Sequence, residues 1–235
     1  MGWNPLGVVD ALLTDLDRTL LWLFKEPARE REAYGDILQM CSARGVPVAL
    51  RSAADCDPYD LWADSYRWAL ANTPPSRAEA LNGAIAARLV AHEVSAAAEA
   101  RLFEGVWDAL EQLSAHQIPV AVVSNNAADA VWLALKANQA EGFVACVLGR
   151  EPSHRLGDLK PSPVLLTQAL DEVGCPPERA IFVGDSTTDM RAGRAAGVRS
   201  IGLRRHSRTS GSALTAAGAA HVLDDFADLR AFLPG

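Results

Sequence analysis

The chain has 235 residues, of which 49% are hydrophobic and 22% charged, and its formal net charge is −7. This balance excludes collagen-like, low-complexity and disordered chains. The acidic excess argues against nucleic acid or an anionic membrane as a partner. No Lys or Arg precedes Arg18, and no apolar run approaches the roughly 18 residues of a membrane span, so we expect a soluble cytoplasmic protein.

Short apolar runs along the chain predict the strands of a sheet. The runs cover residues 8–13, 118–123, 143–148, 180–183, 198–203 and 221–223. The helical patterns between them cover residues 106–113, 127–137, 163–173 and 190–196. Continuous apolar strands that alternate with helices are typical of a parallel sheet covered on both faces. The sequence therefore predicts an α/β fold with a doubly wound parallel sheet.

Residues 22–103 break this alternation. Helix starts are predicted at Pro27, Pro58 and Pro75, because proline favours the first helical position. Whether residues 46–50 form a short strand or a loop stays open. We therefore predict an all-helical domain at 22–103, inserted into an α/β core made of residues 1–21 and 104–235.

Polar side chains follow three of the predicted strands. Asp15 and Asp17 come after the first strand, Ser124 after the second, and Asp185 and Asp189 after the fourth. The carboxyl ends of parallel strands lie at the same edge of a sheet, and ligands bind beyond that edge. We therefore expect these side chains to converge on one site.

The residue types at this edge predict a definite chemistry. Carboxylates brought together repel one another unless a cation is present. Oxygen ligands without His or Cys favour Mg²⁺. With Lys160 and the Ser124 hydroxyl, such a metal could hold a phosphoryl group. One Asp could then act as a nucleophile, and a second carboxylate two residues later could protonate the leaving oxygen.

At these residues the sequence resembles the haloacid dehalogenase superfamily. Residues 14–20 (TDLDRTL) resemble its D-x-D-x-T signature, and residues 184–189 (GDSTTD) resemble its G-D-x-x-x-D motif. Ser124 and Lys160 resemble the second and third motifs, so that all four occur in order. The helical insertion resembles the cap domain of the phosphoglycolate phosphatase-like and phosphoglucomutase-like branch.

This resemblance implies a role for each catalytic residue. Asp15 would be the nucleophile, and Asp17 would be the general acid/base. Lys160 would neutralise charge on the nucleophile and the phosphoryl group. Ser124 would bind the phosphoryl oxygens, helped by backbone N–H groups near Asn125 at the start of a helix.

The resemblance also implies a Mg²⁺ site. Asp15 and Asp185 would coordinate the ion directly, and Asp17 would add its backbone carbonyl. Asp189 would support the metal through water or hold the neighbouring groups.

Arg18 departs from the family pattern, which usually has Gly at this position. A glycine there allows a backbone geometry that a side chain resists. One interpretation is that Arg18 adopts an allowed conformation and points to solvent. The other is that its guanidinium binds an acidic or phosphorylated part of the substrate.

The expected function is a Mg²⁺-dependent phosphatase that hydrolyses a small organic phosphate monoester through an aspartyl-phosphate. The expected partner is a small phosphorylated metabolite, with no nucleic acid and no membrane. A phosphomutase of the same fold remains possible. A dehalogenase is disfavoured by Asp17, because that chemistry needs no acid for the leaving group. A catalytically silent binding or regulatory protein is disfavoured by the complete set of motifs.

Overall fold

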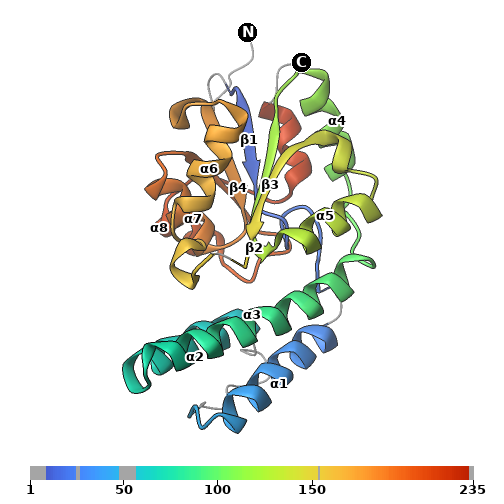
Figure 1. The fold of residues 1–235 in the computed structure, drawn as a ribbon. Coiled ribbons are helices and arrows are strands. Elements are labelled where there is room, and N and C mark those ends of the chain that lie inside the picture. The colour runs from blue at the N-terminus through green and yellow to red at the C-terminus, as the bar shows by residue number, and fades with distance from the viewer. Residues whose placement is uncertain (1–8, 25–26, 48–56, 153, 233–235) are drawn as a thin grey trace. The chain divides into compact units, whose positions relative to one another are not determined.

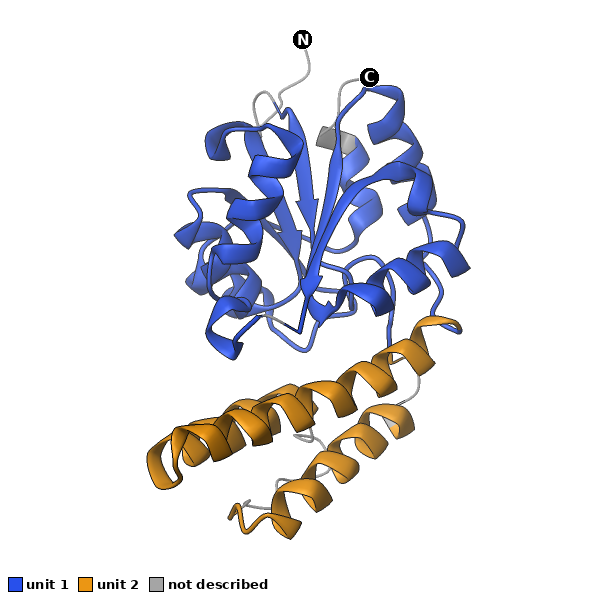
Figure 2. Ribbon diagram, in the orientation of Figure 1, with its two compact units in different colours: residues 1–23, 99–235 blue, residues 24–98 orange. Residues whose placement is uncertain are grey.

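The computed structural model describes residues 9–24, 27–47, 57–152 and 154–232 (Figure 1). The chain divides into two compact units (Figure 2). Residues 24–98 form the first, which we call the helical unit. Residues 1–23 and 99–235 form the second, which we call the α/β unit. The boundaries therefore lie at 23/24 and 98/99, whereas the sequence analysis placed them at 21/22 and 103/104.

The α/β unit is built on a six-stranded parallel sheet with the order β3-β2-β1-β4-β5-β6. The strands are β1 (Ala11–Thr14), β2 (Val120–Ala127), β3 (Val144–Arg150), β4 (Ala180–Gly184), β5 (Arg199–Leu203) and β6 (Ala219–Leu223). Every residue of β1 and β4 is buried, as the continuous apolar runs predict for strands covered on both faces. The predicted α/β class is confirmed.

Helices cover both faces of this sheet (Figure 1). They are α4 (Val106–Ala115), α5 (Ala128–Ala137), α6 (Val164–Val173), α7 (Thr187–Ala195) and α8 (Gly211–Ala217). Helices α4 and α5 lie to one side of the sheet, and α6 and α7 lie to the other. Short 3₁₀ helices complete the unit: η1 (Glu141–Phe143), η2 (Leu156–Asp158), η3 (Pro177–Arg179) and η4 (Phe226–Phe232). The sequence analysis did not predict α8.

Strand β2 is displaced toward the C-terminus relative to its prediction. It runs to Ala127, and α5 begins at Ala128, so the segment around Asn125 is strand and not the start of a helix. The reason is that Ala127 still pairs with Arg150 of β3, after a shift of register beyond Val123. Residue 8, predicted as the start of the first strand, lies outside the described residues.

The helical unit consists of α1 (Pro27–Ala43), α2 (Pro58–Asn72) and α3 (Pro75–Ala97). Asp57 caps α2, because its carboxylate accepts the N–H groups of Tyr59 at 2.8 Å and Asp60 at 3.2 Å. The buried Trp62 donates its indole N–H to Asn82 of α3 at 2.8 Å. Of the segment left open at 46–50, residues 48–50 lie outside the described residues. None of the described helices is long and apolar enough to cross a bilayer.

Candidate active site

Asp15 lies directly after β1, at the centre of the sheet. Its backbone N–H donates to the carbonyl of Val183 in β4 at 2.8 Å, which continues the strand pairing by one residue. Its side chain is buried, and the Thr19 hydroxyl donates to its Oδ2 at 3.5 Å. The Asp15 carboxylate is therefore held by the strands at the edge where a ligand would bind.

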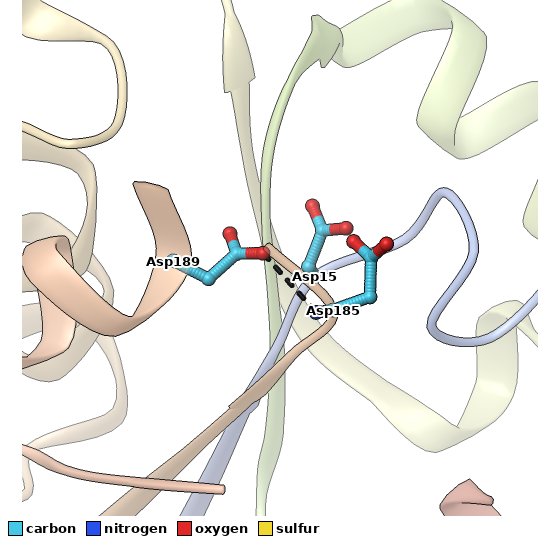
Figure 3. A group of neighbouring side chains, drawn as sticks. All are labelled: Asp15, Asp185 and Asp189. Atoms are coloured by element: carbon cyan, nitrogen blue, oxygen red, sulfur yellow. Dashed lines mark hydrogen bonds between the residues drawn. The ribbon is translucent and has the colours of Figure 1, made fainter. Parts of the chain in front are cut away.

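Two further carboxylates meet Asp15 there (Figure 3). Asp185 follows β4, and Asp189 lies in the first turn of α7. One oxygen from each of the three side chains lies within 4.8 Å of the others, and all three residues are buried. The predicted convergence of these residues is thus present in the structure.

Lys160 supplies positive charge to this group. Its Nζ lies 2.6 Å from Asp15 Oδ1 and 2.7 Å from Asp189 Oδ1, and it also donates to the carbonyl of Val123 at 2.9 Å. Burial by itself would lower the pKa of Lys160, but the two carboxylates outweigh it and raise that pKa above its usual value. The side chain therefore remains an ammonium ion.

One ammonium ion does not neutralise three buried carboxylates. Burial raises the pKa of Asp15 from its ordinary 3.8 to about 7, against the opposing effect of Lys160. Burial and the charges of Asp189 and Asp15 likewise raise the pKa of Asp185. A divalent cation would relieve this repulsion, and a set of oxygen donors without nitrogen or sulfur suits Mg²⁺. The residues present therefore fit that ion.

Asp189 has a different environment from the other two carboxylates. Its Oδ2 accepts the N–H groups of Asp185 at 3.2 Å and Ser186 at 3.0 Å, and the Ser186 hydroxyl at 2.6 Å. Its Oδ1 contacts Lys160. Because its two oxygens together accept three hydrogen bonds and contact Lys160, Asp189 holds its neighbours in place.

Ser124 and Asn125 lie near the end of β2. The Ser124 hydroxyl is buried and donates to Asn126 Oδ1 at 2.9 Å. The Asn125 side chain accepts the Lys160 N–H at 2.8 Å and donates to the Lys160 carbonyl at 3.0 Å. Asn125 therefore fixes the backbone that carries the lysine.

Arg150 is a residue of this region that the sequence analysis did not identify. It ends β3, is buried, and donates to the Asn125 carbonyl at 2.6 Å. A charged residue at the end of a predicted apolar strand was the available signal. Arg150 thus braces the segment that in turn holds Lys160.

Asp17 and Arg18 lie in the turn after Asp15. The Asp17 carboxylate lies outside the three-carboxylate group, and its Oδ1 accepts the Leu23 N–H at 2.8 Å. Arg18 has φ of 61°, in the left-handed region, and its Nε lies 4.0 Å from Asp17 Oδ2. The Arg18 side chain is only 16% exposed. The backbone is thus in a region that a residue other than glycine can adopt, and the side chain is mostly buried, so the interpretation in which it points to solvent is not supported.

Comparison with known proteins agrees with this geometry. A family model described as haloacid dehalogenase-like hydrolase matches residues 68–203. A phosphoglycolate phosphatase of Pseudomonas putida is 31% identical over 134 residues, which are 57% of this chain and 47% of that protein. One of Pectobacterium atrosepticum is 33% identical over 132 residues, covering 54% of this chain and 53% of that protein. The match thus spans about half the length of these relatives.

Solved structures share the fold over nearly the whole chain. CbbY of Rhodobacter sphaeroides in complex with phosphate has a TM-score of 0.66 at 24% identity, covering 94% of this chain and 96% of that one. A haloacid dehalogenase-like hydrolase of Bacteroides fragilis, described as putative, has a TM-score of 0.71 at 18% identity, covering 94% and 99%. At such identities the likeness shows the fold. Since the family model matches more than half of the sequence, the chain belongs to the haloacid dehalogenase-like hydrolases.

Proposed function

We propose that the protein is a Mg²⁺-dependent phosphatase that hydrolyses a small organic phosphate monoester through an aspartyl-phosphate on Asp15. The observation that carries this proposal is the position of Asp15, beside the Lys160 ammonium and the Asp185 carboxylate at the end of a central strand. The relatives named phosphoglycolate phosphatase support the same reaction class. In this proposal the helical unit is a cap domain that selects the substrate, which is a small phosphorylated metabolite.

Asp15 and Asp185 would hold the Mg²⁺, with the backbone carbonyl of Asp17 as a further ligand. The bound ion would neutralise negative charge on the phosphoryl oxygens. Lys160, which stays protonated, would also neutralise negative charge on these oxygens. The Ser124 hydroxyl would turn away from Asn126 Oδ1 to donate a hydrogen bond to a phosphoryl oxygen.

The reaction would occur in two displacements at phosphorus. An Asp15 oxygen attacks the phosphorus atom, and the bond to the ester oxygen breaks as Asp17 donates a proton to it. Water then attacks the phosphorus atom of the aspartyl-phosphate and gives a proton to Asp17. The bond between phosphorus and the Asp15 oxygen breaks, so inorganic phosphate is released and the Asp15 carboxylate is restored. The Asp17 carboxylate would leave the Leu23 N–H to perform these transfers.

The proposal favours a phosphatase over the other functions considered for this fold. A dehalogenase would not need the Asp17 carboxyl, and a silent protein would not need Lys160 buried between two carboxylates. A phosphomutase would use the same residues but return the phosphoryl group to a sugar. Release of inorganic phosphate therefore separates the phosphatase from the mutase.

The test is hydrolysis of an aryl phosphate by the purified protein. We expect activity with Mg²⁺, and loss of that activity with EDTA and recovery on adding Mg²⁺ back. Asp15→Asn should reduce turnover by at least ~10³-fold while leaving the circular dichroism spectrum unchanged. Asp10→Asn, at the other end of the first strand in an ion pair with Arg179, is the matched control and should retain activity. If Asp15→Asn turned over at the wild-type rate, Asp15 could not be the nucleophile.

A panel of phosphorylated metabolites would then identify the preferred ester. We expect kcat/KM for one small phosphate monoester to exceed that for the aryl phosphate, since binding of the remote part of a true substrate contributes to catalysis. Phosphate release should equal ester consumed.

A further inference from the structure

The segment between β5 and α8, residues 204–210, reaches back to the carboxylate group. We call it the β5–α8 loop. The Ser207 hydroxyl donates a hydrogen bond to the backbone carbonyl of Asp185, and the Thr209 N–H donates to Ser207 Oγ at 2.7 Å. Because the hydroxyl accepts one hydrogen bond and donates the other, its orientation toward Asp185 is fixed.

Asp185 is therefore held from both sides of its backbone. Its N–H donates to Asp189 Oδ2 at 3.2 Å, and its carbonyl accepts from Ser207. These two contacts come from different elements, α7 and the β5–α8 loop. Together they set the direction in which the Asp185 side chain leaves the backbone, toward Asp15.

The β5–α8 loop is itself anchored next to Ser207. The ring of His206 stacks on Phe103, with ring centroids 3.7 Å apart and an angle of 14° between the rings. The ring of Trp22 packs against the same imidazole edge-on, with ring centroids 5.6 Å apart and an angle of 65° between the rings. Arg205, the residue before His206, forms an ion pair with Asp225 at 2.6 Å. These contacts keep Ser207 within reach of the Asp185 carbonyl.

We propose that Ser207 is a positioning residue for the metal site, acting through the backbone of Asp185. This inference rests on the proposed function, in which Asp185 binds Mg²⁺. A carboxylate ligand binds tightly only when its oxygens are held in the direction of the ion, and groups that orient ligands affect affinity strongly. Both hydrogen bonds of the Ser207 hydroxyl involve backbone atoms, so its loss should change Mg²⁺ binding and leave ester binding unchanged.

The test is direct binding of Mg²⁺ to the full chain, measured by calorimetry without substrate. Ser207→Ala should weaken Mg²⁺ binding by about 10-fold. It should raise the Mg²⁺ concentration for half-maximal aryl phosphate hydrolysis by the same factor. At saturating Mg²⁺, KM for the aryl phosphate should stay unchanged. Ser207→Thr, which keeps the hydroxyl, should restore the affinity. Ser212→Ala, an exposed serine in α8, is the matched control and should bind Mg²⁺ like the wild type.

A second pair of variants tests the anchor. His206→Ala should weaken Mg²⁺ binding, whereas His206→Phe, which keeps a flat ring against Phe103, should weaken it less. Wild-type affinity in a folded Ser207→Ala protein would overturn the inference while leaving the proposed function intact. A wild-type protein that binds no Mg²⁺ would instead contradict the proposed function itself, and the role of Ser207 with it.

Discussion

The ammonium of Lys160 lies 2.6 Å from the carboxylate of Asp15, although the two residues are 145 positions apart in the chain. The same ammonium lies 2.7 Å from Asp189, so that one buried cation joins the end of β1 to the first turn of α7. This pairing offsets part of the repulsion among the buried carboxylates. It also makes the folded state dependent on one side chain.

Lys160→Met should therefore destabilise the protein strongly. Removing one member of a buried ion pair leaves the other charge without a partner and typically costs about 3–5 kcal/mol. We expect a loss of this size in the free energy of unfolding, measured by urea denaturation. Lys136→Met is the control, because Lys136 is exposed at the end of α5, and it should change the stability little. The double variant Lys160→Met/Asp15→Asn should recover part of the loss, and a double variant no more stable than the single one would contradict this account.

Stabilisation by Mg²⁺ should increase with pH. The pKa of Asp15 is raised by burial from 3.8 to about 7, so its protonated form favours folding below about pH 4, and that contribution is lost as the pH rises through 7. Mg²⁺ requires the ionised carboxylate and competes with the proton. The rise in Tm on adding Mg²⁺ should thus be small at pH 5 and larger at pH 8, as measured by thermal unfolding. An equal rise at both pH values would show that these carboxyls do not bind the ion.

The sequence predicts the members of the site better than it predicts their supports. Asp15 and Asp185 could be placed because each follows an apolar run that ends at the carboxyl edge of a parallel sheet. The roles of Arg150 and Ser207 could not be predicted, because they depend on contacts between segments that are distant in the sequence. Arg150 contacts the neighbouring strand, and Ser207 contacts Asp185 from the β5–α8 loop. The course of β2 past Ser124 was mispredicted for a related reason, because pairing with Arg150 of β3 prolongs the strand.

Gly184, the glycine before Asp185, has a steric role that can be tested. A Cβ at this position would lie 2.6 Å from Cβ and Cγ of Asp189 and 2.7 Å from its Oδ2. Gly184→Ala should therefore displace Asp189, at a cost of about 1–3 kcal/mol in stability. Because Asp189 holds Lys160 and the Asp185 backbone, kcat should also fall, by roughly 10²-fold.

The control for Gly184 is Gly83→Ala in α3, where an added Cβ would meet no atom within 4 Å. Alanine is the better helix former, so this variant should gain about 0.5–1 kcal/mol and keep full activity. Urea denaturation and steady-state hydrolysis of an aryl phosphate would compare the two variants. Wild-type activity in Gly184→Ala would show that Asp189 can move without consequence.

Arg18 combines a backbone effect with a side-chain effect, and two substitutions separate them. Arg18→Ala and Arg18→Gly both remove the guanidinium beside Asp17, but only glycine relieves the left-handed backbone at φ of 61°. Arg18→Gly should therefore be more stable than Arg18→Ala by about 1 kcal/mol. If the guanidinium binds an acidic or phosphorylated part of the substrate, both variants should raise KM for the preferred ester by about 10-fold. This factor corresponds to the loss of about one charge-assisted hydrogen bond. Unchanged kinetics in Arg18→Gly would exclude substrate binding, and a KM effect in Arg18→Ala alone would assign it to the backbone.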